Sequence, residues 1–426
     1  MNKTKQEAAT PQARSSGAAE RGKSHWTIVA FALTVLVGVG VYYRFIWGSV
    51  AGFVAAMDFC DKLFCDFVVY YYEMGRQILS TKAPTAGFYY SPLFALFLAP
   101  FGALELKTAV VWWGVVMVAT TSGLGILSYR TAPPESRVTI AGFLLLFVTS
   151  FPVLHNFKWG QVSVLLVLLV VGSLVTYEKG HVALSAILLA LAVSVKYYPV
   201  VFLAYFLIHR DWKFVLAFVT SLVVFLFLVP AVVLGTDQTL AFLSQLMIES
   251  GEAQRAAGGA NSQALKNVLA RMIPVGRDAV EVSRIAFAAI GYLLLQGNLI
   301  LLFLMRKLPR HEGLTMSFMV LFLSVPLFVG TSWPHYLVYL PFCQTVAFEM
   351  LRQTRGAGVL RRRIMASLLT VSVILASVMM FNLLGSWERY NGAGLLFWSN
   401  MCLLAYLYMY ALPKVLPLHM KHSSET

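Results

Sequence analysis

The sequence has little charge. Only 12% of its 426 residues are Asp, Glu, Lys or Arg, about half the share of an average soluble domain. By contrast, 59% of the residues are apolar or aromatic, and the mean hydropathy is +0.73. Polar side chains are therefore too few to cover a globule in water. These values exclude a water-soluble enzyme and predict a membrane protein, in which about 20 apolar residues make one crossing.

Several familiar signatures are also missing. No paired-cysteine motif or His-Glu-x-x-His occurs, and the eight His are scattered, so nothing indicates zinc. No Gly-x-Gly-x-x-Gly follows a strand, which argues against a domain that binds a nucleotide sugar. Four Cys are present, two of them close together. Because five-residue spacing on a helix turns side chains apart, we expect Cys60 and Cys65 to be two small apolar residues rather than a disulfide.

The N-terminal segment differs from the rest. Residues 1–25 are rich in Gln, Ala, Ser, Lys and Arg and contain almost no large apolar residues, so they are expected to form a disordered cytoplasmic tail. A signal peptide would carry a short apolar region and a cleavage site. The first apolar run, Trp26 to Trp47, is instead long enough to span a membrane. We expect a single transmembrane domain over 26–412 and a second cytoplasmic tail over 413–426.

Apolar runs recur along the whole chain. Together they predict an all-α polytopic membrane protein with about twelve transmembrane helices, near 26–47, 108–128, 138–154, 161–177, 182–195, 197–208, 214–235, 283–305, 314–331, 335–351, 364–384 and 393–411. Lys196 to Pro199 interrupts two short runs. The stretch Ser91 to Leu104 contains two prolines and is too short to cross comfortably, so we expect a half-helix or an interfacial segment there.

The distribution of charge tests this topology. If the N-terminus is cytoplasmic, the cytoplasmic segments hold 20 Lys and Arg against 7 acids, and the opposite, outer segments hold 10 of each. This asymmetry obeys the positive-inside rule, and it places both termini in the cytoplasm. The net charge of +14 is thus explained by membrane orientation and anionic lipid, and it is no evidence for a nucleic-acid partner. Two long loops, 49–90 and 236–282, face the outer side, where function is expected to concentrate.

The first outer loop contains three acids among aromatic residues, Asp58, Asp61 and Asp66. An acid that opens an apolar run can be a helix N-cap or a catalytic base, and the sequence leaves both open. The three acids could in principle hold a divalent cation through oxygen ligands. Their spacing matches no known cage, however, so a metal is possible but unsupported.

Further polar residues fall on the same outer side. Lys196 lies between two short spans; an ionisable residue near membrane depth indicates function, although a Lys that extends to the interface is the structural alternative. His335 alone would fit a structural role. The remaining polar positions are Tyr90, Gln161, Asn261 and Tyr336. A cavity that combined one acid, one Lys, one His, amides and tyrosines would suit an anionic lipid-linked substrate, whose phosphate the cations would neutralise.

In its order of motifs the chain resembles glycosyltransferase family 87, which comprises polytopic GT-C-type enzymes, some of them dependent on polyprenol-phosphate mannose. The resemblance covers roughly residues 60–345. It rests on Asp66-x-x-x-Tyr70-Tyr, Tyr90-Ser-Pro92, Gly160-Gln161, Lys196-Tyr-Tyr-Pro199, Asn261-Ser-Gln263 and Ser332 to Tyr336. This resemblance implies a GT-C-like fold, a polyprenyl-phosphate sugar donor and an inverting transfer on the outer face of the plasma or inner membrane.

The resemblance also implies roles for individual residues. Asp66 is the general base, with Asp58 and Asp61 as alternatives. Lys196 and His335 hold the donor phosphate, and Gln161 and Asn261 contact sugar or phosphate. Tyr90 and Tyr336 complete the donor site, which then comprises Lys196, His335, Gln161, Asn261, Tyr90 and Tyr336. No cofactor is expected. The transferred sugar is a hexose, mannose in the first place, or a pentose, and the acceptor is a lipid or glycan hydroxyl.

Two other functions remain open from the sequence. A transporter or flippase for lipid-linked oligosaccharide would also be polytopic, but such folds often carry internal repeats and polar residues in mid-span. No repeat is visible here, and the polar groups gather at the outer ends of the spans. A ligase for a preassembled glycan would share the leaving group and need a larger acceptor cleft. Sugar transfer is the favoured hypothesis.

Overall fold

The computed structural model describes residues 40, 44, 47–57, 60, 62–131, 145–256, 259, 261–273, 280–354 and 358–416. The described part of the chain is helical throughout, with a single isolated β-bridge between Ser150 and Ser377 and no named strand. The all-α prediction is confirmed for this part. The terminal tails and the first predicted span lie almost entirely outside the described residues.

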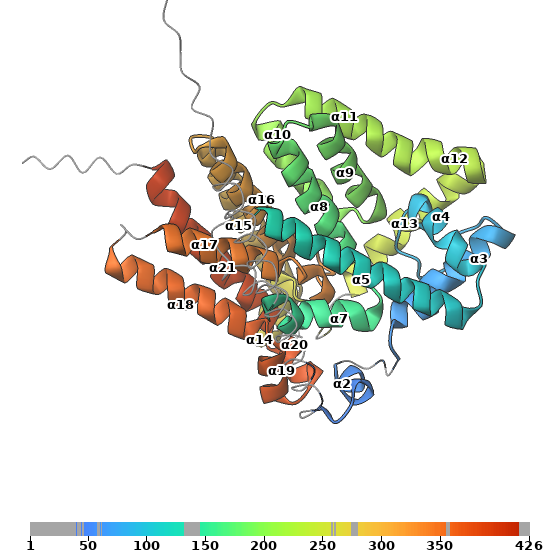
Figure 1. The fold of residues 1–426 in the computed structure, drawn as a ribbon, viewed down its shortest axis with the longest axis horizontal. Coiled ribbons are helices and arrows are strands. Elements are labelled where there is room, and N and C mark those ends of the chain that lie inside the picture. The colour runs from blue at the N-terminus through green and yellow to red at the C-terminus, as the bar shows by residue number, and fades with distance from the viewer. Residues whose placement is uncertain are drawn as a thin grey trace, which may run out of the picture.

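Most helices of the N-terminal half lie together in Figure 1, whereas α2 stands apart from them, near α19. Its elements are α2 (Val50–Ala56), η1 (Phe67–Tyr71), α3 (Tyr72–Ser80), α4 (Pro92–Gly102), α5 (Leu106–Thr131), α7 (Phe151–Trp159), α8 (Ser163–Glu178), α9 (Val182–Val195), η2 (Tyr198–Phe202), α10 (Leu203–Ile208), α11 (Trp212–Val223), η3 (Val224–Leu228), α12 (Val229–Leu234) and α13 (Thr236–Ala256). The long helix α5 packs on α8, and α9 packs between α8 and α11.

The C-terminal half packs beside it. Its elements are α14 (Leu265–Met272), α15 (Val280–Met305), α16 (Arg310–Phe328), η5 (Pro334–Leu337), α17 (Leu340–Gln353), α18 (Val359–Leu375), α19 (Val378–Leu384), α20 (Trp387–Gly392) and α21 (Leu395–Val415). Helix α16 touches α8, η2 and α21, so it joins the two halves. The predicted run 364–384 is divided, because the chain breaks after Leu375 and Ser377 caps the short helix α19 through the amide of Met380.

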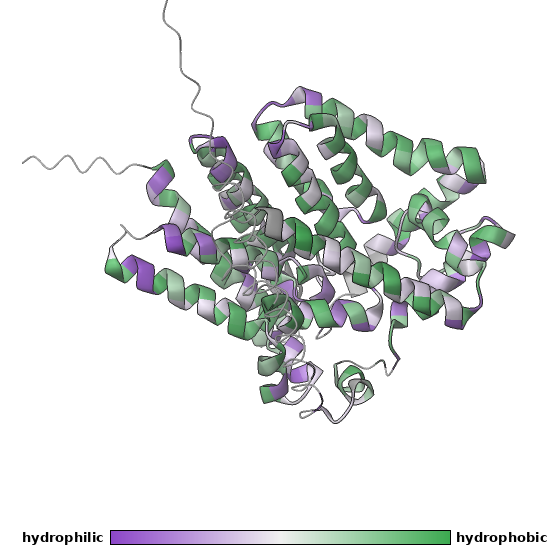
Figure 2. Ribbon diagram, in the orientation of Figure 1, coloured by the Kyte–Doolittle hydropathy of each residue, from purple (hydrophilic) through white to green (hydrophobic). Residues whose placement is uncertain are grey.

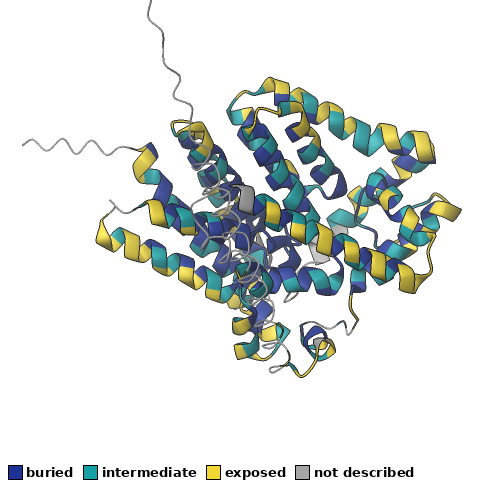
Figure 3. Cartoon of the chain, viewed as in Figure 1, coloured by how far each residue is buried: buried dark blue, intermediate teal, exposed yellow. Residues whose placement is uncertain are grey.

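Within the described residues, five stretches are long and apolar enough to cross a membrane: Leu106–Ser128, Trp212–Leu234, Ile285–Met305, Arg310–Phe328 and Leu395–Val415. Their length and composition indicate a multi-pass membrane protein. In α16, 78% of the most apolar stretch is buried, against 11% in Trp212–Leu234. Helix α16 is thus a central helix, whereas α5 and α11–α12 expose apolar side chains on the outside, as hydrocarbon surroundings allow (Figures 2 and 3).

Two predicted interruptions are confirmed. Helix α4 spans only Pro92–Gly102, begins with proline in its first turn and is capped by Ser91. Helix α9 ends at Val195, and the next helical turn begins only at Tyr198. Pro92 suits the first turn of α4, where its missing amide hydrogen costs no helical hydrogen bond. Pro199 cannot donate the amide hydrogen bond that would extend α9. The two interruptions matter for function, since the residues at these breaks, Tyr90 and Lys196, lie at the ends of helices rather than inside them.

One expectation is wrong. Cys60 and Cys65 form a disulfide. The argument against it assumed a continuous helix between them, but residues 62–64 form a turn and Phe64 has a left-handed backbone with φ of 57°. Because the chain reverses there, helical spacing does not apply. The other two thiols, Cys343 and Cys402, are free.

Candidate active site

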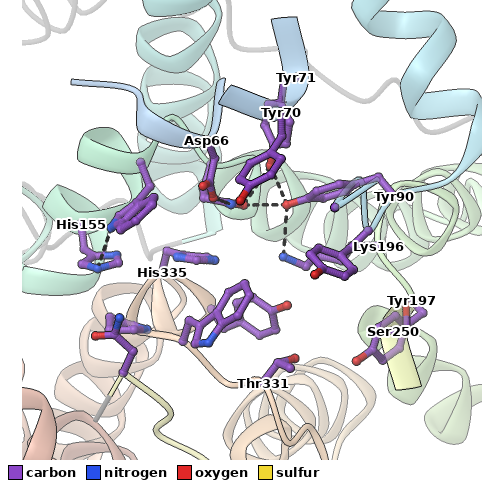
Figure 4. A pocket seen from close by; sticks show the side chains of 18 residues that line it. Asp66, Tyr70, Tyr71, Tyr90, His155, Lys196, Tyr197, Ser250, Thr331 and His335 are labelled. Carbon is purple, nitrogen blue, oxygen red and sulfur yellow. Dashed lines mark hydrogen bonds between the residues drawn. The ribbon is translucent and has the colours of Figure 1, made fainter. Parts of the chain in front are cut away.

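One cavity of about 330 Å³ opens where the loop regions of both halves meet (Figure 4). It lies beside the N-terminal end of α8 and the C-terminal ends of α9 and α16. Tyrosine, tryptophan and polar side chains line most of it: Asp66, Tyr70, Tyr71, Gly87, Tyr89, Tyr90, His155, Trp159, Gln161, Lys196, Tyr197, Ser250, Asn261, Thr331, Trp333, Pro334, His335 and Tyr336. Such a mixture of rings and a few polar groups is typical of a small-molecule site.

Asp66 supplies the carboxylate of this cavity. It stands at the N-cap position of η1, yet its side chain makes no capping hydrogen bond. It accepts instead a hydrogen bond from Nε2 of Gln161. The element that follows, η1, is a π-helical turn, a rare geometry found often at functional sites. The carboxylate therefore serves the cavity, and the N-cap reading of this acid does not apply.

The backbone around Gly160 places Gln161. Helix α7 ends at Gly160, which adopts the left-handed conformation with φ of 67°. The amide of Gln161 then donates to the carbonyl of Asn156 at 3.0 Å. The indole of Trp113, on α5, donates to the carbonyl of Gly160 at 2.9 Å. These bonds hold the turn against α5, so the side chain of Gln161 enters the cavity from a fixed backbone.

Two tyrosines meet Gln161 on its other side. The hydroxyls of Tyr71 and Tyr90 lie 3.0 Å and 2.8 Å from Oε1 of Gln161 and donate to it. The two hydroxyls are also 2.5 Å apart, so the single proton of Tyr71 is shared between the hydroxyl of Tyr90 and Oε1 of Gln161. Burial and the charge of Asp66 raise the pKa of Tyr90 above its usual range. Both tyrosines thus stay neutral hydrogen-bond donors.

Lys196 is the cation of the cavity. It lies between α9 and η2, outside both apolar helices, and its side chain is 6% exposed. Its Nζ lies 3.4 Å from the hydroxyl of Tyr90 and 4.1 Å from the ring centre of Tyr336. Burial lowers the pKa of Lys196 to about 7, an effect that the charge of Asp66 opposes. A bound anion would restore the charged form, which makes this amine suited to an anionic ligand.

His335 lies on the other side of the cavity from Lys196 in the view of Figure 4. Its ring stacks on that of His155, with centroids 5.6 Å apart and planes at 19°. Neither ring nitrogen of His335 has a hydrogen-bond partner among the described residues, although the side chain is buried. Burial, with Lys196 and His155 nearby, lowers the pKa of His335. It is a neutral imidazole that a ligand can engage.

The segment 261–263 reaches the cavity from the connection between α13 and α14. The backbone amide of Gln263 donates to the carbonyl of Ser332 at 2.7 Å, and the hydroxyl of Ser262 donates to the carbonyl of Gly330 at 2.9 Å. The oxygen of the Asn261 side chain accepts from Nδ2 of Asn391 at 3.2 Å. Two distant segments are thus joined edge to edge, and Asn261 and His335 are held at the same wall.

Comparison with known proteins now adds to this geometry. Residues 88–332, more than half of the chain, match the family model of glycosyltransferase family 87. The chain belongs to glycosyltransferase family 87. A polyprenol-phosphate-mannose-dependent alpha-(1-2)-phosphatidylinositol mannoside mannosyltransferase of Mycolicibacterium smegmatis is 32% identical over 138 residues, which cover 29% of this chain and 31% of that protein.

A protein of the same name from Mycobacterium tuberculosis is 29% identical over 151 residues, or 32% of this chain and 35% of that protein. The chain therefore matches about a third of the length of these relatives. No solved structure matches the chain significantly. Family membership thus rests on the sequence match, and the geometry of the cavity comes from this structure alone.

All seven residues predicted for the site of this family 87 protein line the one cavity: Asp66, Tyr90, Gln161, Lys196, Asn261, His335 and Tyr336. The alternatives to the first of them, Asp58 and Asp61, lie outside the described residues. Proximity does not test what each residue does, so the assigned roles remain predictions. A metal ion also remains untested. Within the described residues, no three His, Cys, Asp or Glu side chains are grouped to hold one.

Several lining residues escaped the sequence reasoning. His155 and Trp159 lie on α7, one turn apart, and the indole of Trp159 donates to Nε2 of His155 at 3.0 Å. Tyr71 is the last residue of the motif Asp66-x-x-x-Tyr70-Tyr, but it received no predicted role. A signal existed for these three, because each lies within six residues of Gln161 or Asp66. Trp333 and Ser250 had no comparable signal, since only the tertiary fold brings them to the cavity.

Replacement of Gly160 tests how the turn supports the cavity. A Cβ at this position would lie 3.0 Å from Cβ of Phe64, 3.1 Å from Cβ of Phe67 and 3.1 Å from Nε1 of Trp113. The left-handed backbone adds strain of about 1–3 kcal/mol. We expect Gly160→Ala to lower the thermal unfolding midpoint of the detergent-purified protein and to reduce its activity, because Gln161 and the start of η1 are displaced together.

The matched control is Gly180→Ala. Gly180 also has a positive φ, of 84°, but nothing lies within 4 Å of an added Cβ. This control carries the backbone strain without the clash. If the two variants lost the same stability and kept the same activity, close packing at Gly160 would not support the site.

Proposed function

We propose that this family 87 protein is an integral membrane glycosyltransferase. It transfers a hexose, mannose in the first place, or a pentose from a polyprenyl-phosphate sugar to a hydroxyl of a lipid or glycan. One observation carries the proposal above the others. A carboxylate, Asp66, and a buried ammonium group, Lys196, line the same cavity and are linked through Gln161 and Tyr90. This arrangement pairs a base with a phosphate-binding cation.

The chemistry needs few groups. Asp66 takes the proton of the acceptor hydroxyl while that oxygen attacks the anomeric carbon of the sugar. The bond from the anomeric carbon to the phosphate oxygen breaks, and polyprenyl phosphate leaves with the electron pair. Attack occurs on the face opposite the leaving group, so the configuration inverts. Lys196 stabilises the charge on the departing phosphate, and Tyr90, which donates its own proton to Gln161, lies beside this amine.

No cofactor is part of this proposal. The phosphate is already a good leaving group, so the protein needs mainly to align the hydroxyl with the anomeric carbon. Lys196 supplies charge where a metal ion would otherwise be needed. His335, Asn261 and Tyr336 line the remaining walls and are proposed to contact sugar or phosphate. A nucleic-acid partner forms no part of the function, because the excess positive charge falls in the segments assigned to the cytoplasm.

A groove on the side of the molecule suits the lipid part of the donor. It lies between α10 and α15, has a volume of about 440 Å³ and is lined only by apolar side chains: Ala204, Leu207, Ile208, Leu299, Ile300 and Phe303. Helix α10 continues η2, whose start adjoins Lys196. A phosphate at Lys196 would thus have apolar protein surface along the direction in which its hydrocarbon chain must run.

The proposed orientation puts the cavity on the outer, extracytoplasmic side of the plasma or inner membrane. The GT-C-like arrangement of twelve crossings, with both termini in the cytoplasm, belongs to the same proposal. Helices support it. The cavity lies at one end of α8, α9 and α16, whereas Lys179, Arg306 and Arg310 lie at their opposite ends or in the adjoining turns. Helix α16, with 19 residues, extends about 28 Å, which separates the two sets by a membrane thickness.

The donor assay tests the function directly. We expect the purified protein in lipid vesicles to form a new glycolipid from polyprenyl-phosphate mannose and to release polyprenyl phosphate. Parallel reactions with polyprenyl-phosphate glucose and arabinose identify the sugar. The acceptor series includes phosphatidylinositol mannoside, on which the two relatives act according to their names. Movement of lipid-linked sugar across the bilayer without a new linkage would indicate a flippase instead. Transfer of a preassembled glycan only would indicate a ligase.

A further inference from the structure

A chain of four polar groups crosses the cavity from the cation to the base. Nζ of Lys196 lies 3.4 Å from the hydroxyl of Tyr90, which lies 2.8 Å from Oε1 of Gln161. Nε2 of the same amide contacts Oδ2 of Asp66. The two middle residues are buried, with 5% and 2% of their surface exposed. The path therefore runs through protein and is not replaced by bulk water.

The number of protons fixes the direction of every bond in this chain. The charged form of Lys196 only donates, so the hydroxyl oxygen of Tyr90 accepts from it and the single proton of Tyr90 remains for Gln161. The amide oxygen only accepts, and it takes this proton. The single proton of Tyr71 is shared between the same two oxygens, the hydroxyl of Tyr90 at 2.5 Å and Oε1 of Gln161 at 3.0 Å. The amide must then present its N–H, and never its oxygen, to Asp66.

We propose that Gln161 is a positioning residue for the base, whose amide is held by Tyr71 and Tyr90 with its N–H toward Asp66. The amide N–H can donate a hydrogen bond to an ionised carboxylate. A protonated carboxyl group that directs its own proton toward the amide N–H would be repelled. Gln161 therefore keeps Asp66 ionised and fixes the direction of its carboxylate. This role differs from a contact to sugar or phosphate, and it rests on the proposed transferase function.

Burial makes the flipped orientation of the Gln161 amide unfavourable. If the amide flipped, its oxygen would face the carboxylate and its N–H groups would face two hydroxyl protons. Unsatisfied buried polar groups cost about 1–3 kcal/mol each, so the flipped state is rare. The bonds in a chain also polarise one another in surroundings of low dielectric constant. The positive charge of Lys196 and the negative charge of Asp66 lie at the two ends, in the order that favours this polarity.

Other ionisable groups also face Asp66. Lys196, Tyr71 and Tyr90 interact with its charge, and His155 and His335 line the same cavity. The two tyrosines stay protonated, and Lys196 favours the carboxylate. A change confined to Gln161 leaves these groups in place. The acid limb of the pH profile, the fall in rate as Asp66 gains a proton, is then a specific measure of the role of Gln161.

The first test replaces the donor amide with a second carboxyl group. In Gln161→Glu two carboxyls face each other, and one of them must hold a proton. We expect the acid limb of kcat/KM to move to higher pH by about one unit or more, which narrows the pH range of activity from its acid side. Gln161→Met, which offers neither donor nor charge, should lower kcat about tenfold or more while the KM for the donor changes less than about twofold.

Gln344→Glu is the matched control. Gln344 is also buried and donates to Ser372 at 3.1 Å, but it lies on α17, away from the cavity. Its acid limb should stay at the wild-type pH. An unmoved acid limb in Gln161→Glu, or a tenfold rise in donor KM with unchanged kcat in Gln161→Met, would overturn the proposal and return Gln161 to the donor site.

If Gln161→Glu does not fold, the tyrosines provide an independent test. Each hydroxyl can orient the amide when the other is lost, because both reach Oε1. Tyr71→Phe with Tyr90→Phe should therefore lower kcat by more than the product of the two single effects. Additive effects would overturn the proposal. Failure of the transferase function is distinguishable, since wild-type protein would then form no glycolipid at any pH.

Discussion

Replacement of Asp66 by Asn is expected to reduce sugar transfer by about 10²–10⁴-fold. The side chain keeps its shape, and its oxygen can still accept the hydrogen bond from Gln161. It can no longer take a proton from the attacking hydroxyl. The expected loss therefore falls on kcat, with little change in donor KM. Assays of glycolipid formation by the purified variant, with its unfolding midpoint measured in parallel, separate lost chemistry from lost folding.

Asp211→Asn is the matched control for this loss. Asp211 caps α11 through the amide of Phe214 at 3.1 Å and accepts from Tyr177 at 2.7 Å. It follows the C-terminal end of α10, it does not line the cavity, and Lys196 lies before the other end of this helical segment. Loss of part of this cap should cost about 1 kcal/mol of stability and leave kcat unchanged. Full activity of Asp66→Asn would show that another group is the base. The same replacements at Asp58 and Asp61 would then be the next variants to assay.

Helix breaks were predictable where the sequence contains proline, alone or after a capping residue. Ser91-Pro92 predicts a capped first turn, and Lys196 to Pro199 predicts an interruption, because proline has no amide to donate; α4 and the break after α9 follow these signals. The division of the run 364–384 after Leu375 was not predicted. Ala376 and Ser377 are not next to a proline or glycine. The break is stabilised instead by the backbone amide of Phe151, which donates to the carbonyl of Ala376 at 2.8 Å.

The candidate site was predictable as a set of positions and not as a geometry. Asp66, Gln161 and Lys196 each adjoin a turn or a helix end on the side assigned to the outer face. The sequence therefore predicts that they lie on the same side of the protein, but it does not predict which of them are in contact. The partnership of Gln161 with Tyr71 could not, because it depends on the left-handed turn at Gly160 and on the π-helical turn of η1. Neither conformation has a periodic signature in the sequence.

The disulfide shows the limit of helical spacing as evidence. The spacing of Cys60 and Cys65 is unfavourable on a straight helix, yet Phe64 adopts a left-handed backbone and its amide donates to the carbonyl of Lys158 at 2.6 Å. A tertiary contact with α7 thus bends the segment and brings the sulfurs together. The same bend ends beside Asp66, so the covalent link and the base belong to one local structure.

Lys196→Met is expected to reduce kcat/KM for the donor by about 10²–10³-fold, the effect of removing one strong stabiliser of developing charge. Met keeps the length and the apolar stem of the side chain, so the packing against Tyr336 is largely kept. The exposed Lys179, at the far end of α8, gives the matched control Lys179→Met. This control should keep wild-type kcat/KM, and equal losses in both variants would contradict the assignment of Lys196.

The pH dependence of the wild type provides a second test of Lys196. Burial lowers its pKa to about 7, from an ordinary value near 10.4. The charged form therefore predominates below about pH 7, and it is lost as the pH rises through that value. We expect kcat/KM for the donor to fall on this alkaline side. Because bound phosphate stabilises the ammonium, kcat itself should stay constant to higher pH.

In Lys196→Arg the guanidinium stays charged, so the alkaline fall in kcat/KM should vanish even though the altered geometry lowers activity. A wild-type kcat/KM independent of pH from 6 to about 9 would mean that Lys196 does not bind the phosphate as a cation.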